Sequence, residues 1–327
     1  MNPHLNEDAE DFAAVAGTAF ADAGGVDLAR RAEADPTVRA DTVEPLLRQL
    51  GLDDLDPVGD ADSAEAGAAL CREAGRVVLP YPVVPALLGR LALDSRDAHG
   101  PRPGSSNPRV DHVDAFDEWR VATIHGAAIS AAPAGAPHST RLGPFAGEVT
   151  ETGTADATAL EIALHLTLTG FVVAGALAHA VELATAHVVD RVQFDRPLSK
   201  FQAVQFQLAD AHTEVAGVEE VVQFALWRCH EAPDAALADA LSARLAAADG
   251  ARSVLRITQQ LHGAAGVCDE YDVSVIARHL QPALRLPFGA ETTAAHLADA
   301  IARDGFVGLF PHGPDATDRS TTTASTT

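Results

Sequence analysis

Residues 191–205 read RVQFDRPLSKFQAVQ, and this stretch says more about the fold than any other part of the chain. It follows a long apolar run, turns at Pro197 and opens a new helical run at Phe201, so it predicts a tight connection between two long helices. An arginine, a phenylalanine and several glutamines gather around that turn. Arginine binds phosphate oxygens, amides bind a ribose or a base, and an aromatic ring stacks on a base. The stretch therefore predicts a site for a nucleotide diphosphate.

The sequence that follows residue 156 is almost wholly helical. Its connections are short, and short connections favour antiparallel neighbours, so residues 156–312 predict an up-and-down four-helix bundle. Residues 313–327 are rich in Thr, Ser and Asp and predict a disordered tail. The expected helices are Ala157–Val192, Ser199–Glu231, Asp234–His262, Asp269–Gln281 and Ala290–Arg303.

The first half of the chain divides into two further regions. Residues 1–100 show helical periodicity and predict an N-terminal helical domain, with helices at Ser63–Leu79 and Val84–Leu93. Residues 101–155 predict a β-rich middle region that is too short for a full barrel. The fold class expected from these patterns is mainly α with a reduced β region. The strand-like runs are Trp119–Ile124 and Gly147–Thr150.

The composition excludes several classes of function. The chain has 327 residues and a net charge of −23, and Lys200 is its only lysine, so nucleic-acid binding is not expected. Three cysteines without metal-type spacing predict reduced thiols in a cytoplasmic protein, and the polar, acidic start predicts no secretory leader. The apolar run Leu166–Ala178 is too short to span a bilayer, which predicts a buried helix. The 14 histidines lack the spacing of metal ligands, so no metal site is expected.

Three segments resemble the acyl-CoA dehydrogenase family. Residues 191–205 are similar to its signature R-x-Q-F-x-x-P-L-x-x-F-Q-x-V-Q. Residues 73–83, EAGRVVLPYPV, resemble the E-x-G-R-x-x-x-P-x-P run that ends the family's N-terminal domain. Residues 260–266, QLHGAAG, resemble the Q-x-H-G-G-x-G run between its last bundle helices. The resemblance covers most of residues 40–300.

This resemblance implies FAD as the cofactor and a site shared between subunits. In the family, one subunit holds the flavin ring with its middle β domain. The neighbouring subunit holds the pyrophosphate and adenosine with two segments. The first corresponds to residues 191–205 here and is called the arginine turn, and the second corresponds to residues 260–266 and is called the glycine turn. By resemblance, an arginine pairs with the pyrophosphate, while glutamines, a phenylalanine and backbone N–H groups surround the nucleotide. The implied cofactor-binding residues are Arg191, Gln193, Phe194, Gln202, Gln260, Gly263 and Gly266.

Three departures from the family pattern bear on catalysis and cofactor binding. The family's catalytic carboxylate usually lies in a Y-E-G-T-like turn, and the aligned residues 286–289 here, LPFG, accept no proton. Glu291 follows this turn but begins a helix, where an acidic residue offsets the helix dipole. Some members carry the base on the long helix before the arginine turn, where this chain has His165. Ala264 replaces a glycine, and a positive φ there is unfavourable. The β region is also much shorter than the family's middle domain.

Three hypotheses about function stay open at this point. In the first, the chain is a subunit without a catalytic residue of its own in a heteromeric acyl-CoA dehydrogenase. A homologous partner then supplies the carboxylate and the flavin bed, and the acyl-CoA substrate is bulky, such as a steroid side chain. In the second, the chain is an autonomous homo-oligomeric acyl-CoA dehydrogenase that uses Glu291 or His165 as its base. In the third, it is a non-catalytic helical scaffold.

Overall fold

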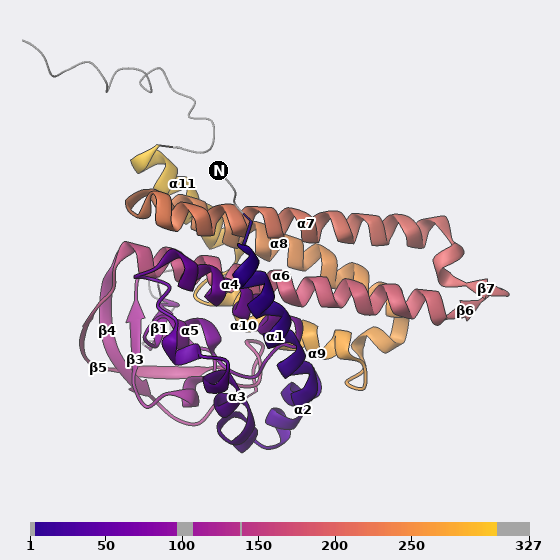
Figure 1. The fold of residues 1–327 in the computed structure, drawn as a ribbon, viewed down its shortest axis with the longest axis horizontal. Coiled ribbons are helices and arrows are strands. Elements are labelled where there is room, and N and C mark those ends of the chain that lie inside the picture. The colour runs from indigo at the N-terminus through magenta and orange to yellow at the C-terminus, as the bar shows by residue number, and fades with distance from the viewer. Residues whose placement is uncertain (1–3, 97–106, 138, 306–327) are drawn as a thin grey trace, which may run out of the picture.

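A computed structural model describes residues 4–96, 107–137 and 139–305, and the statements below refer to these residues. The predicted tail at 313–327 lies outside them. The C-terminal half is a bundle of long helices, shown in orange and pink in Figure 1. Two short helices lead from the third bundle helix to the fourth. The bundle helices are α6 (Ala159–Asp190), α7 (Gln202–Glu231), α8 (Ala236–His262) and α11 (Ala290–Asp304), and the short ones are α9 (Asp272–His279) and α10 (Gln281–Arg285).

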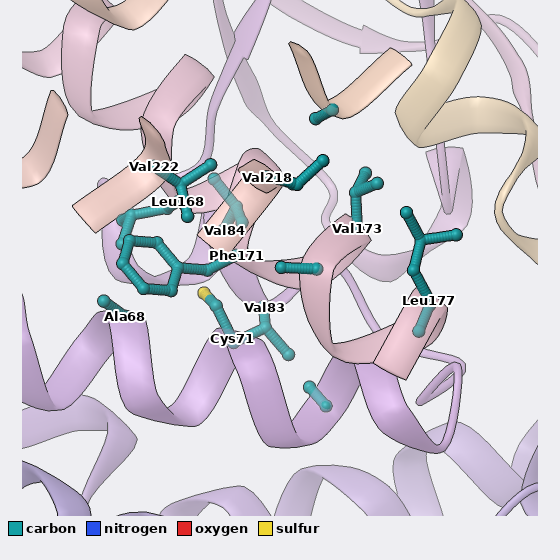
Figure 2. Close-up of a cluster of buried hydrophobic side chains, with 14 of the residues drawn as sticks. Ala68, Cys71, Val83, Val84, Leu168, Phe171, Val173, Leu177, Val218 and Val222 are labelled. Carbon is teal, nitrogen blue, oxygen red and sulfur yellow. The ribbon is translucent and has the colours of Figure 1, made fainter. Parts of the chain in front are cut away.

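Helix α6 is the central helix of the molecule. Its first turn is fixed by a capping box, in which Thr158 and Glu161 satisfy each other's backbone N–H groups. By length and composition α6 could cross a membrane, but 72% of its most apolar window is buried inside the protein. Side chains of α4, α5 and α7 pack on it, as Figure 2 shows for Phe171 and its neighbours. The prediction that the run Leu166–Ala178 is too short to span a bilayer is therefore wrong, whereas the prediction of a buried helix is confirmed.

The N-terminal region is helical, and α4 packs directly on α6 in Figure 1. The predicted helix at Ser63–Leu79 forms as α4, which ends where Val78 adopts a φ of 43°. The predicted helix at Val84–Leu93 is wrong in its second half. Gly89 and Arg90 both have positive φ, so the helix stops and the chain enters the sheet. The N-terminal helices are α1 (Glu7–Ala23), α2 (Asp27–Ala34), α3 (Glu44–Gln49), α4 (Ala61–Arg76) and α5 (Val83–Leu87).

Two glycines let α4 and α6 approach until their backbones touch. A Cβ added to Gly75 of α4 would overlap the carbonyl oxygen of Val172, and a Cβ added to Gly175 of α6 would overlap that of Arg72. Both overlaps involve backbone atoms, which cannot rotate away. The crossing therefore joins the N-terminal helices to the bundle without room for an additional methyl group.

The middle region is a five-stranded sheet with the strand order β1-β3-β4-β5-β2. Strands β1 and β3 pair in parallel, and the other neighbours pair antiparallel. A small core lies on the sheet around the fully buried Trp119, whose indole N–H donates to the carbonyl of Val113 at 3.0 Å. The mainly helical fold with a small strand region is thus confirmed, while the domain boundaries stay a prediction. The strands are β1 (Leu91–Leu93), β2 (Arg109–Val110), β3 (Trp119–Ala122), β4 (Ala127–Pro133) and β5 (Gly147–Asp156).

Candidate functional site

The connection between α6 and α7 is a β-hairpin that projects beyond the end of the bundle (Figure 1). Strands β6 (Val192–Gln193) and β7 (Arg196–Pro197) are joined by Phe194 and Asp195, whose φ angles are 54° and 63°. Two successive residues with positive φ form the tight turn that suits a two-residue hairpin loop. The tip of the connection is therefore formed by Phe194 and Asp195, and the prediction of a turn at Pro197 is wrong by two to three residues. A phenylalanine rarely adopts this conformation, and such strain tends to occur at functional sites.

The hairpin presents its polar and aromatic groups to the outside. The side chain of Phe194 is 83% exposed, and its ring meets the ring of Phe201 edge-on, with the centroids 6.1 Å apart. Arg191, Gln193 and Gln202 are also exposed. Within the described part of the chain, no carboxylate forms an ion pair with Arg191. Its guanidinium group therefore keeps its hydrogen-bond donors free for a ligand.

A stacked pair of histidines brings the arginine hairpin and the glycine turn to the same end of the bundle. The rings of His187 and His262 lie 4.5 Å apart at an interplanar angle of 24°. His187 precedes Arg191 by one helical turn, and His262 is followed directly by Gly263. Burial lowers the pKa of His187, and the neighbouring His262 and Arg191 lower it further. These causes favour the neutral form of the His187 imidazole, and the charge of Asp190 opposes them.

The glycine turn needs glycine at one position for its conformation and at another for packing. Gly263 ends α8 with a φ of 63°, and a Cβ there would meet no atom within 4 Å. Gly266 is buried, and a Cβ there would overlap the carbonyl oxygen of Gln259. Ala264 is absent from the residues with positive φ in the described chain, so the strain expected from the missing glycine does not arise.

Beside the glycine turn, α8, α9 and α10 enclose a groove of about 1270 Å³. Gln260 and Gly263 line it, whereas Arg191, Gln193, Phe194 and Gln202 do not. The predicted residues thus fall into two groups at one end of the bundle, with Gly266 packed inside its turn. The groove contains four arginines and one carboxylate, Asp269, and ion pairs with carboxylates already occupy Arg252 and Arg278, so Arg256 and Arg285 are the cations that it offers to an anion. Its arginines are Arg252, Arg256, Arg278 and Arg285.

A second hollow, of about 150 Å³, lies where the N-terminal helices, the sheet and the bundle meet. His165, Leu286 and Pro287 line it, so both positions at which the resemblance places a base occur in one cavity. Burial lowers the pKa of His165 to about 3, with a further contribution from Arg244, so its imidazole is neutral. Glu291 is exposed in the first turn of α11 and does not line this cavity.

Asp111, a residue that no sequence motif marks, lines the same cavity. Its side chain keeps 31% of its surface accessible, yet the apolar surroundings raise the pKa of its carboxyl group to about 7. The backbone N–H of His112 and the charge of Arg39 oppose this shift. Asp111 follows the two-residue strand β2, and only the tertiary fold brings it near His165. No local pattern in the sequence indicates this proximity.

Replacing Asp111 with asparagine is expected to reduce the dependence of stability on pH. The native state binds this proton more tightly than the unfolded state, because the pKa rises from 3.8 to about 7. The carboxyl group therefore lowers the free energy of unfolding progressively as the pH rises through this interval. Urea unfolding at about pH 5 and about pH 8 should show a smaller difference in Asp111→Asn than in the natural chain. The exposed Asp117→Asn serves as control, and an equal pH dependence in all three proteins would contradict the assignment.

Comparisons with known proteins agree with this architecture. Residues 165–302 match the family model for the C-terminal domain of acyl-CoA dehydrogenases. The acyl-CoA dehydrogenase IpdE2 of Mycobacterium tuberculosis is 30% identical over 240 residues, which cover 66% of this chain and 71% of that protein. The chain belongs to the acyl-CoA dehydrogenase family. Matches to three other curated relatives extend over 99 to 104 residues, which is 25% to 27% of the length of those proteins.

Two solved structures share the fold of this acyl-CoA dehydrogenase family member. A variant of the Tcur3481–Tcur3483 steroid ACAD has a TM-score of 0.78 at 22% identity, covering 92% of this chain and 99% of that one. The ChsE4–ChsE5 complex from Mycobacterium tuberculosis has a TM-score of 0.72 at 18% identity, again covering 92% and 99%. At these identities the likeness concerns the fold. The resemblance noted in the sequence is confirmed.

Proposed function

We propose that this chain is one subunit of a flavin-dependent acyl-CoA dehydrogenase built from two different chains. It binds the adenosine-pyrophosphate half of an FAD molecule that it shares with its partner. A homologous partner subunit supplies the catalytic carboxylate and the bed of the flavin ring, and the substrate is a bulky acyl-CoA such as a steroid side chain. Its likeness to the ChsE4–ChsE5 complex and to a steroid ACAD supports this proposal. FAD, when bound, supplies the acceptor for the hydride removed from the acyl chain.

The length of α6 is the observation that carries the shared cofactor site in this proposal. His165 lies in its second turn and lines the cavity, and Arg191 directly follows its last residue. At a rise of 1.5 Å per residue, the two are separated by about 39 Å along one helix. A single dinucleotide does not extend that far. A nucleotide bound by the arginine hairpin therefore serves the reaction centre of another chain.

The groups at this end of the molecule fit the nucleotide half of FAD. The free guanidinium group of Arg191 can donate two parallel hydrogen bonds to phosphate oxygens. The exposed ring of Phe194 offers a face or an edge to a base, and Gln193 beside it offers an amide. The open backbone at Gly263 and the guanidinium groups of Arg256 and Arg285 in the groove beside it favour a second anionic contact.

Co-expression with a homologous partner tests the proposal. The chain purified alone is expected to retain no flavin and to oxidise no acyl-CoA. The assembled complex is expected to oxidise acyl-CoA and to contain about half a flavin per polypeptide, because only one of the two sites that a pair of unlike chains could form has the flavin bed of the partner. Flavin absorbance per polypeptide and a dye-reduction assay measure both properties. One flavin per polypeptide and full activity in the chain alone would refute it.

The carboxyl group of Asp111 favours a second candidate function. A carboxyl group with a pKa of about 7 in an apolar cavity is suited to accept a proton, and the neutral His165 lines the same cavity. In this alternative the chain is an autonomous acyl-CoA dehydrogenase whose base is Asp111 or His165 rather than Glu291. The purified single chain then has activity that Asp111→Asn or His165→Leu abolishes. Inactivity of the single chain would eliminate this alternative.

A further inference from the structure

His187 lies one helical turn before the arginine that the proposed function assigns to the pyrophosphate. The backbone N–H of Arg191 donates to the carbonyl oxygen of His187 at 2.9 Å, so the two residues lie on successive turns at the end of α6. Residues in this relation are neighbours, with about 5–6 Å between their Cβ atoms. A charged group bound to the guanidinium group of Arg191 therefore acts on the imidazole of His187 as well.

The imidazole of His187 is held by ring stacking. It stacks on the ring of His262, with the centroids 4.5 Å apart and an interplanar angle of 24°. His262 is itself buried, and its Nδ1–H donates to the carbonyl oxygen of Thr258 at 2.7 Å, which fixes the orientation of its ring. His187 is only partly buried, and its ring nitrogens form no hydrogen bond with the described residues. Such an imidazole can take up a proton from solvent.

The charged groups around His187 come from its own segment and from α8. Burial lowers the pKa of His187 most, and His262 and Arg191 lower it further, whereas Asp190 raises it. Tyr271 reaches the cluster from the segment after the glycine turn, and its ring meets that of His262 edge-on, with the centroids 6.4 Å apart. An anion bound to Arg191 offsets the field of the guanidinium group and adds negative charge beside the imidazole. It therefore raises the pKa of His187.

We infer that His187 is a proton-linked part of the phosphate site and takes up a proton when the pyrophosphate of the dinucleotide binds to Arg191. The inference rests on the proposed function, because it takes this dinucleotide as the ligand of the arginine hairpin. Since the imidazolium form attracts the anion and the neutral form does not, proton binding and nucleotide binding strengthen each other. The affinity for FAD consequently rises as the pH falls from about 8 to about 6. The pyrophosphate diester does not titrate in this interval, so the proton goes to the protein.

Titration of the flavin-free complex with FAD at about pH 6 and about pH 8 tests this inference. Each unit by which the bound anion raises the pKa of His187 strengthens binding at the lower pH by up to about tenfold. We expect several-fold tighter binding at the lower pH, and calorimetry in buffers of different ionisation enthalpy should show uptake of protons. His187→Gln stays uncharged and should lose both effects. His212→Gln, at an exposed position of α7, is the control and should keep them.

A lysine at the same position separates the charge of His187 from its packing. His187→Lys is charged at both pH values, so it should bind FAD at the higher pH more tightly than the natural complex does, without uptake of protons. An affinity of the natural complex that does not change with pH would overturn the inference and leave the cofactor site in place. The same change with pH in His187→Gln would also overturn it.

The chain alone tests the inference without the partner or the flavin. Sulfate is the probe, because it is a divalent anion that does not titrate near neutral pH. The ring protons of His187 can be identified in NMR spectra by their loss in His187→Gln. The pKa of His187 should be higher in sodium sulfate than in sodium chloride of equal ionic strength, and Arg191→Ala should abolish this difference. Equal pKa values of His187 in the two salts would contradict the inference. An effect of sulfate in a chain whose complex binds no FAD would refute the proposed function but not the proton-linked anion site.

Discussion

The assembled complex is expected to lose its flavin when Arg191 is replaced by alanine. The guanidinium group is exposed and, among the described residues, has no carboxylate partner, so its donors are available to a phosphate. Hydrogen bonds to a charged group contribute about 1.5–3 kcal/mol each. Loss of two such bonds weakens FAD binding by about 100-fold or more. Flavin content after gel filtration and titration of the apo-complex with FAD measure the effect.

Two further variants control this experiment. Arg191→Lys keeps the positive charge but not the planar pair of donors, so it should recover only part of the affinity. Arg31→Ala removes an exposed arginine on α2, far along the chain from the hairpin, and should leave the flavin content unchanged. Full flavin content in Arg191→Ala would remove the hairpin from the cofactor site. A wild-type complex that contains no flavin would favour the scaffold hypothesis instead.

Gly175→Ala is expected to produce the largest loss of stability of any single methyl addition to the core. The added Cβ would overlap the carbonyl oxygen of Arg72 in α4, and neither backbone can yield without moving a whole helix. Overpacking typically costs about 1–3 kcal/mol and exceeds this range where backbone atoms collide. The midpoint of thermal or urea unfolding measures the loss.

Gly217→Ala provides a matched control, in which the same substitution is expected to raise stability rather than lower it. Gly217 lies inside α7 on an exposed face, and a Cβ there meets no atom within 4 Å. Alanine is therefore expected to stabilise the chain by about 0.5–1 kcal/mol through its higher helix propensity. If both variants show the same change, the close crossing of α4 and α6 does not determine stability.

The sequence predicts the long helices of this protein better than it predicts the turns and short strands between them. Apolar periodicity indicates α7 and α8, and a long apolar run indicates α6, each within a few residues, because long helices carry a strong local signal. The hairpin at Phe194 was missed because the sequence around it lacks the usual Asn-Gly or Asp-Gly turn. The segment Leu91–Leu93 was missed because a three-residue strand is defined by its partner β3 rather than by its own composition.

In the candidate site, the motifs can be recognised in the sequence, whereas the contacts between them depend on the tertiary structure. The motif around Arg191 and that around Gln260 are contiguous in the sequence, so both can be recognised there. Their common location depends on the contact between His187 and His262, which joins the ends of two helices distant in the sequence. Asp111 enters the cavity through the sheet, and its raised pKa depends on neighbours from other regions. Such properties follow from packing, and no short pattern encodes them.

The exposed tip of the hairpin links the exchange of the cofactor to the association of the subunits. If the dinucleotide is held between the exposed Phe194 on one subunit and the bed of its partner, its binding stabilises the contact between the two subunits. Cofactor release and quaternary dissociation then become a single linked equilibrium, in which each ligand of the folded chain strengthens the other. The lifetime of the assembly in a cell would rise and fall with the supply of free flavin nucleotide.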